Sequence, residues 1–234
     1  MQLYLNETSP FSRVVVATAL LSRSSPLSFV WVDPWNSPEN LKRVNPFCLI
    51  PALELEDGTS LTESLCICQC LIEIYQPQTL RQVTLSDTNE MQQLGTAKTL
   101  MEIAFRTAAI TRYSDNDNPL IQRGKEGILG SLKQLDQMIE QHGLDAHLTN
   151  NLSTLYLHVA LDYVKFRHAT LFGEVDSRNI IDFMRQSPFG SILSQINIDA
   201  LAQKPTYERL LVACSHKITG ITNVEKSTVR MGYT

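Results

Sequence analysis

The stretch that decides the fold of this chain covers residues 45–75 and reads NPFCLIPALELEDGTSLTESLCICQCLIEIY. Apolar and acidic side chains alternate over residues 52–56, and this period of two predicts a strand with one buried face. Asp57-Gly58 is a tight-turn signal, and pairing resumes at Leu61. We therefore expect two short antiparallel strands joined by a two-residue turn.

A helix is predicted directly after this hairpin. Ile67 and Leu71 lie four residues apart, as on one helix face, and Pro77 ends the pattern. The helix then begins near Ser64, where backbone N–H groups without helical partners favour a carboxylate or a phosphate. The alternative is that residues 62–64 only cap the helix.

The beginning of the chain reads as strand, helix, strand. Residues 2–6 and 28–33 predict the strands, the second buried on both faces, and residues 11–21 predict the helix. This order implies a right-handed parallel crossover. Residues 34–44 are polar and predict a loop with at most one helical turn. With the hairpin, we expect an α/β domain with a mixed four-stranded sheet over residues 1–78.

Beyond a linker at residues 76–86, the sequence predicts helices. A second, all-helical bundle domain is expected over residues 87–213, and residues 214–234 form a tail. The apolar helix over residues 151–168 is expected at its centre, capped by Asn151 and Thr154. The other predicted helices cover residues 87–113, 120–142, 176–185 and 198–213.

Composition excludes several classes of function. The 234 residues are 43% hydrophobic with a net charge of −4, so the chain lacks the basic surface of a nucleic-acid-binding protein. No apolar run is long enough to span a bilayer, and the N-terminus has no secretory signal pattern. Five cysteines, an odd number, are typical of a reducing compartment, and the five histidines show no metal-binding spacing. We expect a cytoplasmic protein without a metal.

In order and spacing, three motifs resemble the N-terminal domain of glutathione transferases. They are Asn-Pro-x-x-x-Ile-Pro-Ala-Leu from residue 45, Asp57-Gly58, and Leu-x-Glu-Ser ending at Ser64. The resemblance implies a thioredoxin-like domain in which Pro51 is cis, Ile50 pairs its backbone with the cysteinyl part of glutathione, and Glu63 and Ser64 hold the γ-glutamyl end. An X-Pro bond is the one peptide bond for which the cis form costs little.

The turn after the first strand contains Thr8-Ser9-Pro10-Phe11-Ser12-Arg13 and resembles the active-site turn of serine-type transferases, such as the plant tau class and some bacterial enzymes. The resemblance implies that the Ser9 hydroxyl donates a hydrogen bond to the glutathione sulfur. A free thiol is mostly protonated at pH 7, so a donor and a helix N-terminus both favour the reactive thiolate. Thr8 and Ser12 are the rivals for this role.

One position departs from the family pattern. Leu49 stands where related bacterial proteins have a polar residue, and leucine cannot donate to the glycine carboxylate of glutathione. Lys42 or Arg13 would then have to hold that carboxylate. The resemblance further implies an electrophile pocket between the domains, for which Phe11, Phe105, Arg106 and Tyr113 are the candidates.

The resemblance implies a homodimeric detoxification enzyme that conjugates the glutathione thiolate to small hydrophobic electrophiles, with glutathione as co-substrate. The first alternative is a binding or regulatory protein that keeps the fold without turnover. The second is a glutathione-dependent peroxidase or thiol reductase, which would normally have a cysteine in place of Ser9.

Overall fold

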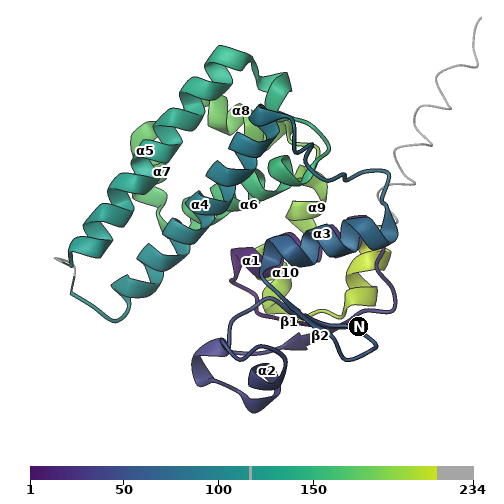
Figure 1. Ribbon diagram of the computed structural model, residues 1–234. Helices are drawn as coiled ribbons and strands as arrows, with labels where there is room; N and C mark the ends of the chain where they lie inside the picture. Colours follow the sequence, from purple (N-terminus) through teal and green to yellow (C-terminus); the bar gives the residue numbers. More distant parts are fainter. Residues whose placement is uncertain (116–117, 215–234) are drawn as a thin grey trace, which may run out of the picture.

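The computed structural model of the protein describes residues 1–115 and 118–214. Within them a four-stranded sheet and its helices form the N-terminal part, and helices alone form the rest (Figure 1). The strands are β1 (Gln2–Leu5), β2 (Ser28–Trp31), β3 (Ala52–Glu54) and β4 (Ser60–Thr62). The helices are α1 (Pro10–Leu21), η1 (Pro34–Asn36), α2 (Glu39–Val44), α3 (Ser64–Tyr75), α4 (Thr88–Thr111), α5 (Pro119–His142), η2 (Leu144–His147), α6 (Leu152–Arg167), α7 (Ala169–Val175), α8 (Arg178–Gln186), α9 (Gly190–Gln195) and α10 (Ile198–Ala202).

The expected fold class is confirmed. The sheet has the order β2-β1-β3-β4, with β1 parallel to β2 and antiparallel to β3, and β3 antiparallel to β4. Leu3 and Leu5 of the central strand β1 are fully buried. This mixed sheet is followed by the helical part, as in the predicted thioredoxin-like domain with a helical second part.

The hairpin differs from the two-residue turn that we expected. Only Gly58 has a positive φ, of 85°, whereas both residues of such a turn would need one. The N–H of Leu55 donates to the carbonyl of Thr59 at 2.8 Å, and that of Gly58 donates to the carbonyl of Leu55 at 3.1 Å. The loop is therefore three residues long, a length at which one glycine is sufficient.

Two further expectations for the N-terminal part need correction. Phe29 packs against one hydrophobic cluster and Val30 against the other, but β2 is an edge strand and most of its side chains are only half-buried. Residues 34–44 contain more helix than one turn, since η1 and α2 both form there. Buried Leu41 and Val44 hold α2 against the sheet. The helix was not expected because most residues of this segment are polar.

The helical part is centred on α6, as its apolar sequence predicted. Twelve of the sixteen residues of α6 are buried. The predicted cap is confirmed, because the Asn151 side chain accepts a hydrogen bond from the N–H of Thr154 at 3.1 Å. Helices α4 and α5 approach so closely at Gly124 that a Cβ there would lie 2.0 Å from the hydroxyl oxygen of Thr107.

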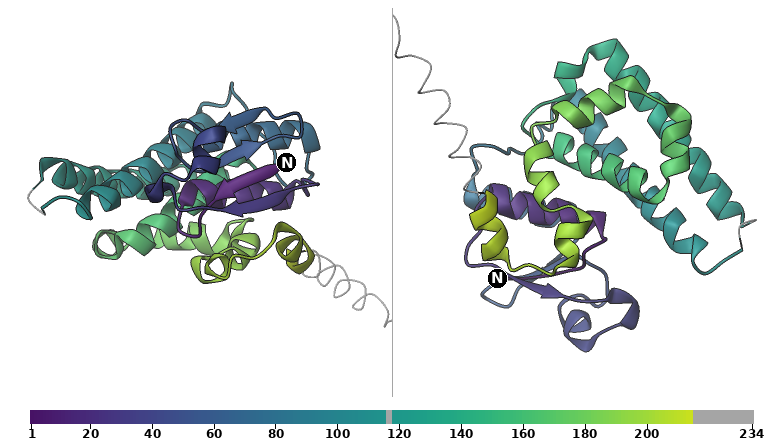
Figure 2. Two further views of the ribbon diagram at one scale, coloured as in Figure 1. Left: turned by 90° about the horizontal axis from the view of Figure 1, so that it is seen from below. Right: turned by 180° about the vertical axis from the view of Figure 1, so that it is seen from behind.

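The last described helices return to the N-terminal part and lie beside α1 (Figure 2). The Tyr207 hydroxyl donates to the carbonyl of Ala19 at 2.9 Å, and the rings of Tyr207 and Phe29 meet at 5.6 Å. The single helix expected over residues 198–213 is two helical pieces, because Pro205 interrupts it after Lys204, whose φ is 47°. The sequence analysis also missed α7 and α9. The predicted tail lies, beyond Cys214, outside the described residues.

We predict that Asn151→Ala lowers the free energy of unfolding by about 1 to 2 kcal/mol, because it removes the cap of the central helix at a fully buried position. Urea denaturation followed by circular dichroism measures this change. The matched control is Asn197→Ala, at the exposed cap of the five-residue α10, which should cost less. Equal losses in the two variants would contradict the central role of α6.

Candidate functional site

A cavity of about 1230 Å³ lies between the sheet domain and helices α4 to α7. Its N-terminal wall is formed by the turn between β1 and α1, residues 45–51 and the start of α3. Eight residues expected at the site from sequence line this single cavity: Ser9, Phe11, Ile50, Pro51, Glu63, Ser64, Phe105 and Arg106.

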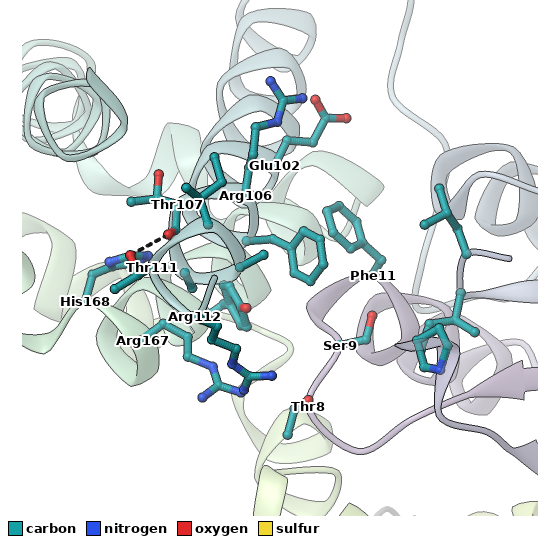
Figure 3. A pocket seen from close by; sticks show the side chains of 18 of the residues that line it. Thr8, Ser9, Phe11, Glu102, Arg106, Thr107, Thr111, Arg112, Arg167 and His168 are labelled. Atoms are coloured by element: carbon teal, nitrogen blue, oxygen red, sulfur yellow. Dashed lines mark hydrogen bonds between the residues drawn. The ribbon is translucent and has the colours of Figure 1, made fainter. Parts of the chain in front are cut away.

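Ser9 is the N-cap of α1. Its backbone N–H donates to the side-chain oxygen of Asn6 at 2.9 Å, and its hydroxyl oxygen accepts from the N–H of Ser12 at 3.1 Å. An accepting hydroxyl still has its own proton to donate, and no described residue takes that proton. Figure 3 shows the Ser9 hydroxyl at the cavity, beside Phe11. Ser9 therefore presents an available donor at the positive end of a helix.

Its rivals differ in position. Thr8 also lines the cavity (Figure 3), whereas the Ser12 side chain is fully buried and is not part of the lining. Arg13 points away from the cavity. It pairs with Asp162 at 2.7 Å and donates to the carbonyl of Leu193, so it is not placed to hold a ligand carboxylate.

The Ile50–Pro51 peptide bond is cis, as the resemblance implied. Ile50 is half-buried in the cavity wall. Its N–H and C=O have no hydrogen-bond partner within the part of the chain that the structure describes. Both groups are strong hydrogen-bonding groups, so they are available to the backbone of a peptide-like ligand.

Glu63 and Ser64 form a connected polar pair at the start of α3. Glu63 has a φ of 70°, and its carboxylate accepts from the Ser64 hydroxyl at 3.1 Å. Ser64 is only 2% exposed and accepts from the hydroxyl of Tyr156 on α6 at 2.9 Å. Lys98 on α4 pairs with the other Glu63 oxygen at 2.7 Å. Two side chains from the helical part therefore hold this pair in place.

Tyr156 and Lys98 were not expected at the site from the sequence. A tyrosine on an otherwise apolar buried helix needs a hydrogen-bond partner, which was the available signal for Tyr156. Lys98 also pairs with Glu102 at 2.5 Å and lies 5.9 Å from the centre of the Phe11 ring. No local pattern shows that α4 brings this lysine to Glu63.

The Glu63 carboxylate is held in its charged form. Burial acts to raise its pKa, but the Lys98 ammonium and hydrogen bonds from Leu65 and Ser64 outweigh burial, so the pKa lies below the usual 4.5. Because the pKa is lowered, Glu63 loses its charge only as the pH falls through that lower value. The carboxylate, which is paired with Lys98, thus stays negatively charged at neutral pH.

The side of the cavity that was expected from sequence to hold an electrophile has an aromatic wall. The rings of Phe11 and Phe105 meet edge to face at 5.8 Å. Tyr113, expected here, is not part of the lining. Its side chain is 70% exposed, and its ring lies 5.6 Å from that of Trp35, which does line the cavity.

Lys42 also needs correction. Its ammonium pairs with Glu39 at 2.5 Å on the exposed face of α2, and Lys42 is not among the cavity residues. The cavity instead contains cations of the helical part, which the sequence analysis did not select. They are Lys98, Arg112, Lys125 and Arg167, beside the expected Arg106. Figure 3 shows Arg112 and Arg167 with their guanidinium groups on the side of Thr8.

The described residues contain no cluster of histidine, cysteine, aspartate or glutamate arranged for a metal ion. His168, in the cavity wall, meets the carbonyl of Ala104 through Nε2 at 2.9 Å, and burial lowers its pKa. None of the described helices is both long and apolar enough to cross a membrane.

Comparison with protein families gives a match over residues 3–79 to the family described as "Glutathione S-transferase, N-terminal domain". No curated protein sequence matches the chain. The N-terminal part is therefore identified as a glutathione S-transferase N-terminal domain.

Solved structures show the same fold along most of the chain. A glutathione S-transferase from Methylobacillus flagellatus, solved with glutathione bound, is 19% identical at a TM-score of 0.70, covering 86% of this chain and 98% of its own. A glutathione transferase family member from Pseudomonas fluorescens with bound S-(propanoic acid)-glutathione is 18% identical at a TM-score of 0.65. The match covers 80% of this chain and 95% of that protein. Gtt2 from Saccharomyces cerevisiae is 18% identical at a TM-score of 0.65, and the match covers 82% of this chain and 100% of Gtt2. This chain has the glutathione S-transferase fold.

We predict that Lys98→Met raises the pKa of Glu63, because the variant removes the ammonium that favours the charged carboxylate. A pH titration of the side-chain carboxyl carbon by NMR measures the shift. Lys125→Met is the control, since it removes a lysine from the same cavity without touching Glu63. An unchanged Glu63 pKa in Lys98→Met, or an equal shift in both variants, would show that Lys98 does not set this charge.

Proposed function

We propose that this chain, with its glutathione S-transferase N-terminal domain and fold, is a glutathione transferase that conjugates glutathione to small electrophiles with an apolar body. The observation that carries the proposal is the convergence on one cavity of the Ser9 hydroxyl, the unpaired backbone of Ile50 and the Glu63–Ser64 pair. Two solved relatives of the same fold hold glutathione or a glutathione conjugate.

In this proposal each end of glutathione meets a group of suitable charge. The α-amino group of the γ-glutamyl residue pairs with the Glu63 carboxylate, which stays ionised at neutral pH. The Ser64 hydroxyl, which donates to Glu63 in the structure, turns to donate to the α-carboxylate, and backbone N–H groups at the start of α3 donate to it as well. The cysteinyl backbone pairs with the N–H and C=O of Ile50.

The reaction needs the thiolate of glutathione as nucleophile. The Ser9 hydroxyl donates to the sulfur, and the N-terminus of α1 adds a positive potential, so both lower the thiol pKa from its free value of about 8.5. Each pKa unit corresponds to about 1.4 kcal/mol. The sulfur then attacks an electrophilic carbon of a substrate whose apolar body lies against Phe11 and Phe105, and the leaving group departs with the bonding electrons.

We also propose a cytoplasmic homodimer. Phe47 is 75% exposed and Leu49 is 61% exposed on the N-terminal domain, and a second copy would bury these apolar side chains. Cys48, Cys66, Cys68 and Cys70 form no disulfide bond within the described residues, which suits a reducing compartment.

A non-catalytic glutathione-binding protein is the alternative. It would share the binding contacts but lack thiolate formation. Peroxidase or thiol-reductase chemistry has less support, since Ser9 rather than a cysteine occupies the turn at α1. The two experiments below separate binding from thiolate formation.

We predict that Ser9→Ala lowers kcat/KM for conjugation about ten- to hundredfold, because a hydrogen bond to a charged group is worth about 1.5 to 3 kcal/mol. The thiol pKa of bound glutathione, followed by thiolate absorbance, should rise in the same variant. Ser9→Thr keeps both the hydroxyl and the helix cap and should retain activity. If Ser9→Ala stayed active while Thr8→Val lost activity, the donor would be Thr8.

We predict that the parent chain binds glutathione saturably in calorimetry and that Ser64→Ala weakens binding about tenfold or more. The variant removes the hydroxyl that donates to Glu63 in the structure and that is proposed to donate to the γ-glutamyl carboxylate. Ser60→Ala, an exposed serine on β4 outside the cavity, is the matched control. Absence of binding at millimolar glutathione would exclude the proposed function. Binding without visible thiolate near neutral pH would favour the non-catalytic alternative.

A further inference from the structure

Two arginines face the electrophile side of the cavity. Arg112 lies just beyond the end of α4, and Arg167 is the last residue of α6. Both line the cavity, and Figure 3 shows their guanidinium groups directed into it on the side of Thr8. Their charges also act together on Tyr163, a third lining residue: burial raises the pKa of Tyr163, and Arg167 and Arg112 oppose this rise.

Neither arginine has an acidic partner. Among residues 1–115 and 118–214, no carboxylate lies within ion-pair distance of Arg112 or Arg167. Four carboxylates line the cavity. Glu63 and Glu102 are already paired with Lys98, and neither Glu126 nor Glu174 lies within ion-pair distance of either arginine. Two like charges in a partly enclosed cavity repel each other, and this cost is relieved when an anion binds between them.

The chemistry of the two side chains specifies the anion. A guanidinium group offers parallel N–H donors that match the two oxygens of a carboxylate. Arg167 is half-buried, so its charge is screened by water less than that of a fully exposed arginine. The aromatic pair Phe11 and Phe105 provides an apolar surface for the rest of the molecule.

We infer that the electrophile bound in this cavity carries a carboxylate on its apolar body, and that Arg112 and Arg167 hold this group. The inference rests on the proposed function and narrows its substrate class. The glycine end of glutathione has the same chemistry. We assign the arginines to the electrophile because Arg112 directly follows α4, the helix that carries Phe105, and both arginines come from the helical part and not from the N-terminal wall that contains Ile50, Glu63 and Ser64.

The test compares two S-aryl conjugates of glutathione that differ in one group. S-(4-carboxy-2-nitrophenyl)glutathione carries the acid, and S-(4-carbamoyl-2-nitrophenyl)glutathione carries a neutral amide at the same position. Calorimetry gives the dissociation constant of each conjugate and of glutathione for the parent, Arg112→Gln, Arg167→Gln and the double variant. Arg123→Gln is the matched control, because it removes an α5 arginine that is not part of the cavity.

We expect the parent to prefer the carboxylate conjugate about ten- to hundredfold, and the double variant to lose this preference. The Arg123→Gln variant should keep it, and glutathione affinity should be the same in all chains. Equal binding of the two conjugates by the parent would overturn the inference while leaving the proposed function intact. A parallel loss of affinity for glutathione itself in the double variant would assign the arginines to the glycine carboxylate. This result would also overturn the inference. Failure of the parent to bind glutathione would instead remove the proposed function.

Discussion

The hydroxyl of Tyr156 donates a hydrogen bond to the Ser64 hydroxyl across the boundary between the two parts of the chain. Both side chains are almost completely buried, so each needs the other as a partner. Ser64 in turn donates to Glu63, which Lys98 holds from α4. The start of α3, where the proposed γ-glutamyl site lies, is thereby fixed by the helical part and not by its own domain alone.

Other contacts also connect the N-terminal part to the helical part. Arg13 at the start of α1 is bound to Asp162 of α6 and to carbonyl groups of α9 and of the residue after it. Near the other end of α1, the Tyr207 hydroxyl donates a hydrogen bond to the carbonyl of Ala19. One continuous hydrophobic cluster includes residues of both parts. The N-terminus of α1, which carries Ser9, is consequently held at a fixed place relative to α4 and α6, and the cavity lies between them.

The cavity combines two electrostatic settings. At the start of α3 the charges are matched, because Lys98 is shared between Glu63 and Glu102. On the side formed by the ends of α4 and α6, Arg112 and Arg167 have no acidic partner among the described residues. A ligand that places a zwitterionic end near Glu63 and an acid near the arginines would complement both settings. The side of the cavity with Phe11 and Phe105 therefore contains unpaired positive charge as well as apolar surface.

The sequence by itself determined the class of fold and most of the N-terminal wall of the site. Local rules were sufficient for the hairpin, the cap at Asn151 and the helix starts at Ser9 and Ser64, because these depend on residues close together in the chain. The edge position of β2 was misjudged, since neighbouring strands decide it. The exact turn was also misjudged, and the break at Pro205 was missed although a proline inside a helix is a local signal.

Only the tertiary structure decided which charged side chains line the cavity. From sequence, Arg13 and Lys42 were the candidate cations for the glycine carboxylate of glutathione. In the fold, Arg13 pairs with Asp162, and Lys42 pairs with Glu39 outside the cavity. The fold brings Lys98, Arg112 and Arg167 to the site instead. These residues lie far from the motif in the sequence, so only the packing of α4 and α6 against the N-terminal domain places their charges there.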